Sequence, residues 1–516
     1  MDWTDIHYRQ LARLISRHTW LYTEMVVDMT ILHSPHTDKH LYFPSEQRPI
    51  VCQLGGSNPE KLAAAARIAA GYGYDEINLN CGCPSDRVAG AGCFGASLML
   101  QPEAVGDGCR AMEEATGTEV TVKCRLGVDD VDSYEELCHF IRTVSERSGV
   151  RHFIMHARKC LLSGLSPAQN RTVPPLRREW VWALKRDFPE LEFSLNGVVQ
   201  DCHEAAAALQ HEEAGAQLHG VMIGRAAYHG PWACLGNADM AVFGAASNAA
   251  ANRREVLARY GEYGDSILGR FGVKDDGHKI PNVRAVIKPL IGLFYGEPGG
   301  RRWRNAIDRV LLQKPATVSE VIQEALKTIP DHVLDAPPPQ LDALPTFSLP
   351  EPLPPPHSAL AHAGGGVSSL NAALLPKSVA DPAGASEEHS REQQQAALLG
   401  TSQAIADIRE ATAASRQPEH AAAVSMSGSG GEGTAEAKRL RLDSCAAGDV
   451  PGAGAAEDHS GVALDPHHIE GQSTLEQGLQ HAQEEGIDAA MALEQHPEQT
   501  GKHRPYLEKG RVLVSA

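Results

Sequence analysis

One short stretch of the chain, NLNCGCP, combines the side chains that are best suited to chemistry. An apolar, β-prone run ends at Asn78 and Asn80, and the chain then turns through Gly82, Cys83 and Pro84. In parallel α/β folds, the carboxyl ends of the strands form the rim where active sites lie. A thiol at such a rim can act as a general acid when a reacting carbon is within reach. Cys83 is therefore the candidate proton donor, although an isolated cysteine is more often a half-buried packing residue.

A metal site is the alternative use of these cysteines. Cys81, Cys83 and Cys93 lie close together in the sequence. A structural zinc ion needs four ligands, and neither a second Cys-x-x-Cys pair nor a pair of spaced histidines completes the set. We therefore expect no metal.

Polar residues also occur at the ends of the other β-prone runs. Taken singly, each is explained as a capping or surface group, but they recur at the same phase of successive strands and should share one rim. Amide, ammonium and imidazole groups can hydrogen-bond a polar heterocycle, and a Gly-Arg turn that opens a helix can bind a phosphate through backbone N–H groups. Together they predict a bound flavin mononucleotide (FMN), with its phosphate at the last strands. The residues are Gln53, Lys123, His156, Asn196, Gly224 and Arg225.

The elements that must position these groups follow a repeating pattern. Seven β-prone runs alternate with helical, Ala-rich stretches over residues 1–243. Such repeats of strand and helix predict a parallel sheet, and eight of them would close a (β/α)8 TIM barrel. A doubly wound sheet is the alternative, but no Gly-rich dinucleotide fingerprint follows the first run. We predict the barrel, with its first strand missing, because the chain opens in what reads as a loop and helix.

The rest of the chain divides into two further regions. Residues 251–333 show only helical patterns and predict a small helical domain. Residues 334–516 carry most of the net charge of −18 and contain only two aromatic residues, Phe347 and Tyr506. A segment so poor in apolar residues cannot offset its ordering entropy, so we predict a disordered acidic tail. No apolar run approaches the roughly 18 residues of a membrane span, and the cysteines lack disulfide-scaffold spacing.

Several motifs together resemble those of the tRNA-dihydrouridine synthases, and specifically the A-type subfamily. The resemblance covers residues 2–330 almost continuously, so it is far more specific than any single motif. It rests on DWTD, LYTEMV, QLGG, GCPSDRV, VKCRLG, HARK, GLSPAQNR, NGV, GVMIGRAAY and GLFYGEPGGRRWR.

The resemblance implies a reaction and a set of roles. It implies reduction of the uracil C5–C6 bond in the D-loop of tRNA, typically at positions 20 and 20a, with NADPH reducing FMN. The cysteine that directly precedes proline, Cys83, is implied as the proton donor to C5, while hydride passes from reduced FMN to C6. Asn80 matches a position that holds the RNA near the flavin. The flavin-contacting positions are matched by Gln53, Lys123, His156, Asn196, Gly197, Val198, Gly224 and Arg225.

A tRNA-binding surface needs basic side chains, because the phosphate backbone dominates affinity. Residues 1–333 are nearly neutral, with 36 Lys and Arg against 40 Asp and Glu, so local clusters must supply the charge. Arg158 lies in one such cluster. Arg301 and Arg304 share a face of a predicted helix. We expect these three arginines to contact RNA phosphates.

The start of the chain departs from the family pattern. Family members begin with a strand that reads approximately V-A-P-M-M before D-W-T, and this chain starts at the last Met. The absence of that strand makes a non-catalytic RNA-binding module one alternative. Another flavin barrel oxidoreductase is the second alternative. We expect a monomer in the cytoplasm, or in a plastid or mitochondrion if the N-terminus is incomplete.

Overall fold

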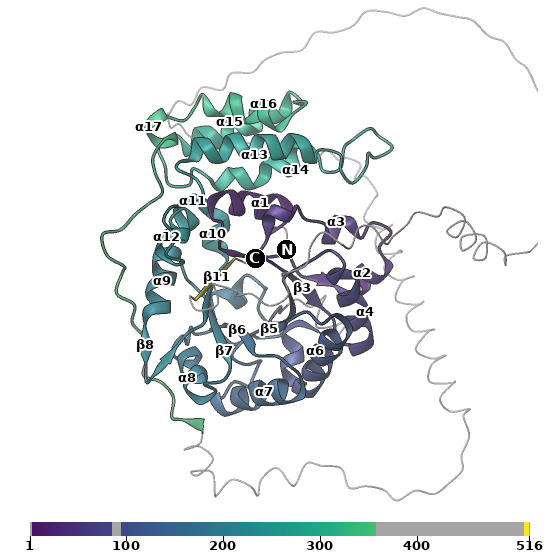
Figure 1. Cartoon of the computed structure of the whole chain (residues 1–516), viewed down its shortest axis with the longest axis vertical. Helices are drawn as coiled ribbons and strands as arrows, with labels where there is room; N and C mark the ends of the chain where they lie inside the picture. Colours follow the sequence, from purple (N-terminus) through teal and green to yellow (C-terminus); the bar gives the residue numbers. More distant parts are fainter. Residues whose placement is uncertain (1–2, 85–93, 358–509, 515–516) are drawn as a thin grey trace, which may run out of the picture. The chain divides into compact units, whose positions relative to one another are not determined.

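Eight short parallel strands close into a ring in the computed structural model, which describes residues 3–84, 94–357 and 510–514 (Figure 1). A two-residue strand, β2 (Val26–Val27), pairs with the end of β3 and lies outside the ring proper. The ring confirms the predicted barrel. Its strands, in order round the barrel, are β11 (Arg511–Val514), β1 (Trp20–Tyr22), β3 (Ile50–Gly55), β4 (Glu76–Cys81), β5 (Val120–Cys124), β6 (His152–His156), β7 (Glu192–Asn196) and β10 (Gly220–Ile223).

The strand that was expected to be missing is present at the other end of the sequence. β11 pairs in parallel with β10 on one side, through Gly220 and Arg511, and with β1 on the other, through Leu21 and Val514. The helix α1 (Ile6–Ile15) precedes β1 in the chain, whereas β11, the neighbour of β1 in the ring, comes last. The expectation of an incomplete barrel is wrong. The strand has only four residues and lies at the end of a polar region, so it carries no periodic signal that marks it as a barrel strand.

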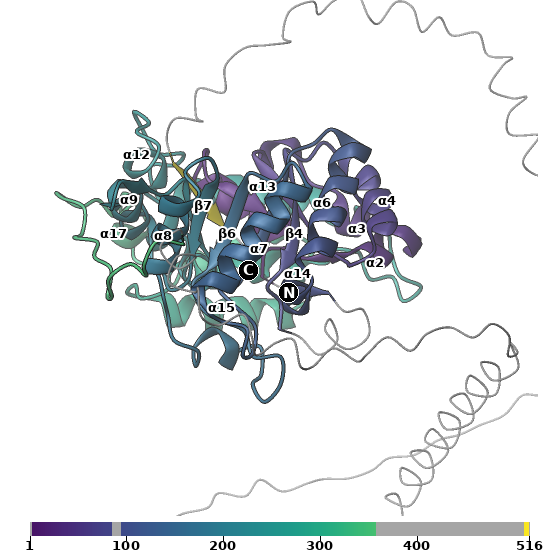
Figure 2. The same ribbon diagram turned by 90° about the horizontal axis from the view of Figure 1, so that it is seen from below.

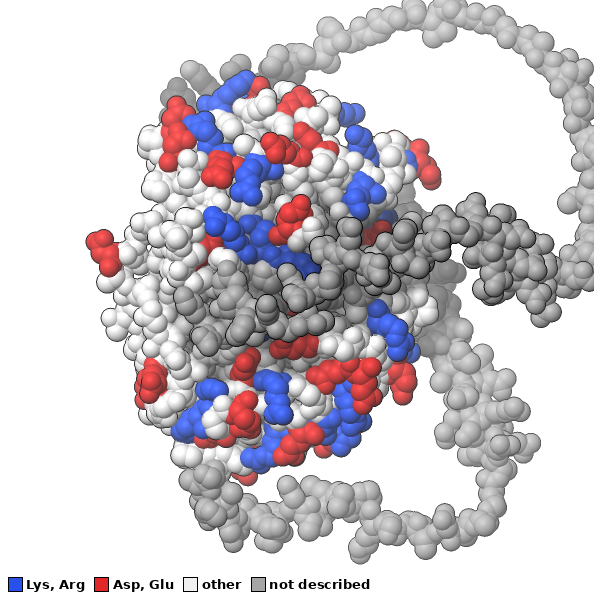
Figure 3. Space-filling model, viewed as in Figure 1, with Lys and Arg blue, Asp and Glu red and all other residues white. Residues whose placement is uncertain are grey.

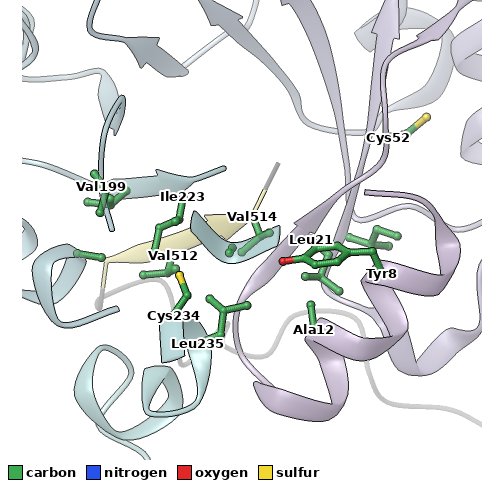
Figure 4. Packing of buried hydrophobic residues seen from close by; sticks show 14 of the residues in the cluster. Tyr8, Ala12, Leu21, Cys52, Val199, Ile223, Cys234, Leu235, Val512 and Val514 are labelled. Atoms are coloured by element: carbon green, nitrogen blue, oxygen red, sulfur yellow. The ribbon is translucent and has the colours of Figure 1, made fainter. Parts of the chain in front are cut away.

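The outer faces of the strands pack against a layer of helices. In β11, Val512 and Val514 are at most 1% exposed and join the same apolar cluster as Leu21, Cys234 and Leu235 (Figure 4). Figure 2 shows α4, α6 and α7 on the outside of the strands. The helices of the barrel region are α1, α2 (Asp28–His33), α3 (Asp38–Leu41), α4 (Pro59–Ala70), α6 (Pro102–Thr116), α7 (Tyr134–Arg147), α8 (Glu179–Asp187), α9 (Cys202–Gln210), α10 (Arg225–His229), α11 (Pro231–Leu235) and α12 (Ala238–Ala241).

Local sequence explains where these helices begin. The Asn58 side chain caps α4 by accepting from the Lys61 N–H, and proline occupies the first turn, as the sequence predicts. A capping box formed by Ser133 and Glu136 opens α7. The shorter connecting elements are η1 (Ser45–Gln47), η2 (Gly95–Leu100), η3 (Gln169–Arg171), β8 (Glu212–Glu213) and β9 (Ala216–Gln217).

The inside of the barrel is layered. Tyr22, Val51, Ile154, Met222 and Leu513 form a small apolar cluster of their own. Side chains alternate along β4. Ile77, Leu79 and Cys81 pack outward, whereas Glu76, Asn78 and Asn80 form hydrogen bonds across the interior.

A helical bundle follows the barrel in the chain. Its elements contact the barrel through α1, where His7 Nδ1 lies 2.9 Å from the Tyr263 hydroxyl. Pro289 marks the change from α14 to the short 3-10 helix that follows, because proline cannot donate to the preceding turn. The elements are α13 (Arg253–Ile267), α14 (Val283–Ile287), η4 (Lys288–Gly292), α15 (Gly300–Leu312), α16 (Val318–Leu326) and α17 (Asp331–Leu334).

Both described ends of the predicted tail pack on the barrel. The Phe347 ring stacks on Trp182 with centroids 5.2 Å apart, and Arg186 donates to the Pro354 carbonyl. At the far end, β11 enters the ring. Residues 358–509, to which the prediction of disorder mainly applies, lie outside the described residues. No helix in the described part of the chain is long and apolar enough to cross a membrane.

Candidate active site at the carboxyl rim of the barrel

The structure brings together the polar residues that the sequence placed at strand ends. Asn80 lies beside Lys123 in the register of β4 and β5, and His156 lies beside Asn196 in that of β6 and β7. Gln53 of β3 accepts a 2.8 Å hydrogen bond from Asn80 Nδ2. All five residues stand at the carboxyl end of the ring, so the predicted rim exists. Their roles toward a ligand remain predictions.

The turn that carries Cys83 is held from two sides. Asn80 Oδ1 accepts from the backbone N–H groups of Gly82 and Cys83, each at 3.0 Å. Arg125 Nε donates to the Gly82 carbonyl at 3.1 Å, and the same buried guanidinium also donates to the Asn170 carbonyl. These contacts fix the backbone of the turn before any ligand binds.

Among the free cysteines that the structure describes, Cys83 alone is half-buried and the others are buried. Burial raises the pKa of the Cys81 thiol well above its ordinary value, which suits an inert packing residue. Cys93, the third cysteine of the zinc alternative, lies outside the described residues. Within residues 3–84, 94–357 and 510–514, no three His, Cys, Asp or Glu side chains form a group that could hold a metal ion.

The rim is strongly basic. Burial, together with the neighbouring Arg125, lowers the pKa of Lys123 to about 8. Burial and the surrounding cations, Arg125 and Lys123 first among them, lower the pKa of His156 well below its usual range, so this imidazole is neutral. Arg158 and Arg171 also have lowered pKa values, because of burial and then because Arg225 is close. Crowded cations repel one another, and a bound anion would relieve that repulsion.

The backbone at the ends of β7 and β10 supplies further features of the rim. Gly197 has φ +135°, and a Cβ there would meet Leu176 and His156 at 3.2 and 3.5 Å. Gly224 directly precedes α10 and caps it without any side-chain hydrogen bond, as the predicted phosphate turn requires. Asn196 Nδ2 donates to the Met222 carbonyl at 3.0 Å, which orients the amide.

Val198 has a strained backbone. Its φ of +55° lies in the left-handed region, which is costly for a β-branched residue. We expect Val198→Gly to raise the free energy of unfolding by about 1 kcal/mol, because glycine adopts this conformation freely. Urea unfolding measures the change. Val173→Gly is the control: Val173 is exposed and is not among the residues with positive φ, so the same substitution there should destabilise slightly. Equal effects at the two positions would contradict the prediction.

Lys123 is expected to destabilise the ligand-free protein. Its folded pKa of about 8 lies below the ordinary 10.5, so the unfolded chain binds its proton more tightly at neutral pH. Lys123→Met should therefore raise the free energy of unfolding by roughly 2 kcal/mol at pH 7, and the gain should shrink as pH rises from 8 to 10.5. Unfolding in urea at pH 7 and pH 10 tests this. Lys327→Met, at a side chain that is 67% exposed, should change stability little at either pH.

The predicted RNA-contacting arginines lie in two places. Arg158 belongs to the rim, where its guanidinium donates to the Pro174 carbonyl. Arg301 and Arg304 are exposed on α15, where the buried Trp303 between them anchors the helix by donating to the Leu290 carbonyl. The structure therefore places these two in the bundle and not in the rim cluster. Figure 3 shows basic side chains gathered near the centre of one face.

Several residues of the site were not singled out from the sequence. Arg125 is recognisable in the strand-end motif VKCR, two residues after Lys123, but the sequence alone predicts no role for it. The interior partners Glu76 and Thr121 could have been found from the alternation within their strands, in the way that Asn78 is found at the end of its strand. Nothing in the local sequence around Arg511 indicates that it enters the barrel.

A cavity of about 430 Å³ lies at the opposite, amino-terminal end of the strands. It contains none of the predicted site residues, so we assign it no part in the chemistry. Its lining includes Lys185, Glu192, Leu209, Gln217, His219 and Gly510.

Comparisons with known proteins agree with this geometry. A sequence model of a family described as dihydrouridine synthase (Dus) matches residues 1–330. A tRNA-dihydrouridine(20/20a) synthase of Vibrio parahaemolyticus is 44% identical over 334 residues, which are 64% of this chain and 96% of the relative. A protein of the same name from Escherichia coli K12 is 44% identical over 331 residues, which are 64% of this chain and 90% of the relative.

Proposed function

We propose that this chain, which belongs to the dihydrouridine synthase family, reduces uridine to 5,6-dihydrouridine in the D-loop of tRNA, at positions 20 and 20a. The names of the relatives support this substrate and these positions. The observation that carries the proposal is the placement of Cys83. A half-buried thiol is held in a fixed turn, next to a ring of amides and cations at the carboxyl end of a closed barrel.

The residues of the rim fit FMN. The amides of Gln53 and Asn196 and the ammonium of Lys123 can hydrogen-bond a polar ring, and neutral His156 can donate from one ring nitrogen. The crowded cations and the start of α10, where no side chain bonds the free N–H groups, favour a phosphate held by Gly224 and Arg225. Gly197 and Val198 would contribute backbone contacts. When bound and reduced by NADPH, FMN supplies the hydride for uracil C6.

The protein's own residues then have distinct tasks. Cys83 donates its thiol proton to uracil C5, the carbon next to C6, which receives the hydride. A base can reach this site only when it leaves its stack, which loop nucleotides do at low cost. We assign Asn80 to holding the base, and Arg158, Arg301 and Arg304 to tRNA phosphates, whose contacts should weaken with salt.

The experiment uses the full chain purified without added flavin. We expect a yellow protein with FMN absorbance that consumes NADPH and forms dihydrouridine on an unmodified tRNA transcript. A colourless protein that retains tRNA would favour the non-catalytic RNA-binding module instead. That alternative arose from the missing first strand, and β11 fills this position in the ring. Flavin reduction that is unaffected by deleting the helical bundle, with no reaction on tRNA, would favour another flavin oxidoreductase.

A further inference from the structure

A continuous chain of hydrogen bonds runs through the barrel interior, from the closing strand to the Cys83 turn. It begins where Arg511 of β11 donates to Glu76 Oε2 at 3.0 Å. Glu76 Oε1 accepts from Thr121 Oγ1 at 2.6 Å, and Thr121 accepts from Asn78 Nδ2 at 2.8 Å. Asn78 Oδ1 accepts from Gln53 Nε2 at 2.9 Å.

The chain ends at the candidate active site. Gln53 Oε1 accepts from Asn80 Nδ2 at 2.8 Å, and Asn80 Oδ1 accepts from the N–H groups of Gly82 and Cys83. Five side chains from three strands thus connect Arg511 with the backbone of the turn that presents the thiol.

The charged end of the chain is fully enclosed. The side chains of Arg511 and Glu76 are 4% and 1% exposed, and the guanidinium carbon lies 4.3 Å from the centroid of the Trp20 ring. Burial raises the pKa of Glu76 to about 7, and the guanidinium of Arg511 is the strongest influence against that rise. The Tyr22 hydroxyl also donates to the carboxylate, at 3.2 Å. Arg511 is therefore the buried cationic partner that favours the ionised form of this carboxylate.

When the carboxylate of Glu76 is ionised, it determines the direction of every bond in the chain. It only accepts, so Thr121 must donate its single proton to it and must accept from Asn78. The side-chain oxygen of Asn78 must then accept from Gln53, and the side-chain oxygen of Gln53 must accept from Asn80. This direction of hydrogen bonding leaves the Asn80 oxygen free to accept from the two N–H groups of the turn. It also leaves Gln53 and Asn80 each with one spare N–H donor for a ligand.

We propose that Arg511 and Glu76 are positioning residues for uridine reduction, because their ion pair sets the orientation of the amides that hold Cys83 and face the ligand. This inference rests on the proposed function. Through this ion pair, the C-terminal strand β11 orients residues of the candidate active site in addition to closing the barrel. A purely structural role is the competing explanation, because buried ion pairs and polar networks also stabilise cores.

The first test interrupts the chain without touching either charge. Thr121→Val keeps the shape but removes the hydroxyl that links Asn78 to Glu76. Ser194→Ala is the matched control, because it removes another hydroxyl of the barrel interior, whose 2.7 Å bond to His152 belongs to no path to Cys83. We expect Thr121→Val to lower kcat by roughly 10- to 100-fold, with the KM for tRNA nearly unchanged and Ser194→Ala close to wild type.

A second readout does not depend on turnover. Alkylation of the native protein by iodoacetamide, with the modified Cys83 peptide quantified by mass spectrometry, reports how firmly the turn is held. Thr121→Val should speed this alkylation several-fold, and Ser194→Ala should not. If the wild type forms no dihydrouridine, the proposed function fails, while alkylation still decides whether the chain controls the turn.

The double variant Glu76→Gln with Arg511→Met tests the ion pair itself. Removing both charges avoids a lone buried charge, so the protein should fold. We expect lowered kcat and faster Cys83 alkylation, as in Thr121→Val. Wild-type kcat and alkylation in this double variant would overturn the proposal, as would equal changes in Thr121→Val and Ser194→Ala.

Discussion

A chain that ends at residue 357 should fail to form a stable barrel, because it lacks β11. Val512, Leu513 and Val514 are each at most 1% exposed, and burying one such side chain contributes about 1.5–3 kcal/mol. Three of them together approach the entire stability of an ordinary domain, which is about 5–15 kcal/mol. The truncation also opens the edges of β1 and β10 and leaves the buried Glu76 without its cation. Soluble yield and thermal unfolding followed by circular dichroism measure the effect.

The control for this truncation restores the strand at the other end. Residues 510–516 are placed ahead of Met1 through a short Gly-Ser linker, and the chain again ends at residue 357. The order of strands round the ring is then unchanged, and α1 follows β11 directly in the chain. We expect thermal unfolding close to that of the full chain. Cooperative unfolding of the truncated chain at the same temperature as the full chain would show that β11 does not close the barrel.

Cys83→Ala should lower the rate of dihydrouridine formation by roughly 100- to 10,000-fold, the range for losing a general acid. The backbone contacts of the turn do not use the thiol, so bound flavin and tRNA affinity should stay at wild-type levels. The rate of Cys83→Ser should lie between those of the wild type and Cys83→Ala, since a hydroxyl is a weaker acid than a thiol. Single-turnover assays on unmodified tRNA, with flavin absorbance measured on the same samples, check each part.

Cys81→Ala is the matched control for the thiol. Cys81 lies two residues before Cys83, at the end of β4, and packs on the outer face of that strand in the apolar cluster. Its loss should lower stability modestly through a small cavity and leave the rate unchanged. If Cys83→Ala keeps the wild-type rate, the proton comes from another group and the assignment of Cys83 is wrong.

The starts of helices and the packing of the predicted tail differ in how far local sequence describes them. Helix starts such as that of α4 follow from Asn58 and Pro59 alone. The packing of Phe347 on Trp182 could not be predicted, because an isolated aromatic residue in a Pro-rich segment has no periodic pattern that names its partner.

The sequence by itself determined the parallel β/α architecture and the rim. The period of two within each strand and the polar residues at strand ends are local patterns, and they are sufficient to identify Gln53, Asn80, Lys123, His156 and Asn196 as rim residues.

Only the tertiary structure decided how the ring closes and what holds its interior. Arg511 and Glu76 are separated by 435 positions in the chain, yet their side chains bond at 3.0 Å. Pairing between segments so distant depends on which faces the whole fold brings together and leaves no trace in neighbouring residues. The closing strand and its hydrogen-bond path to Cys83 are therefore properties of the folded barrel.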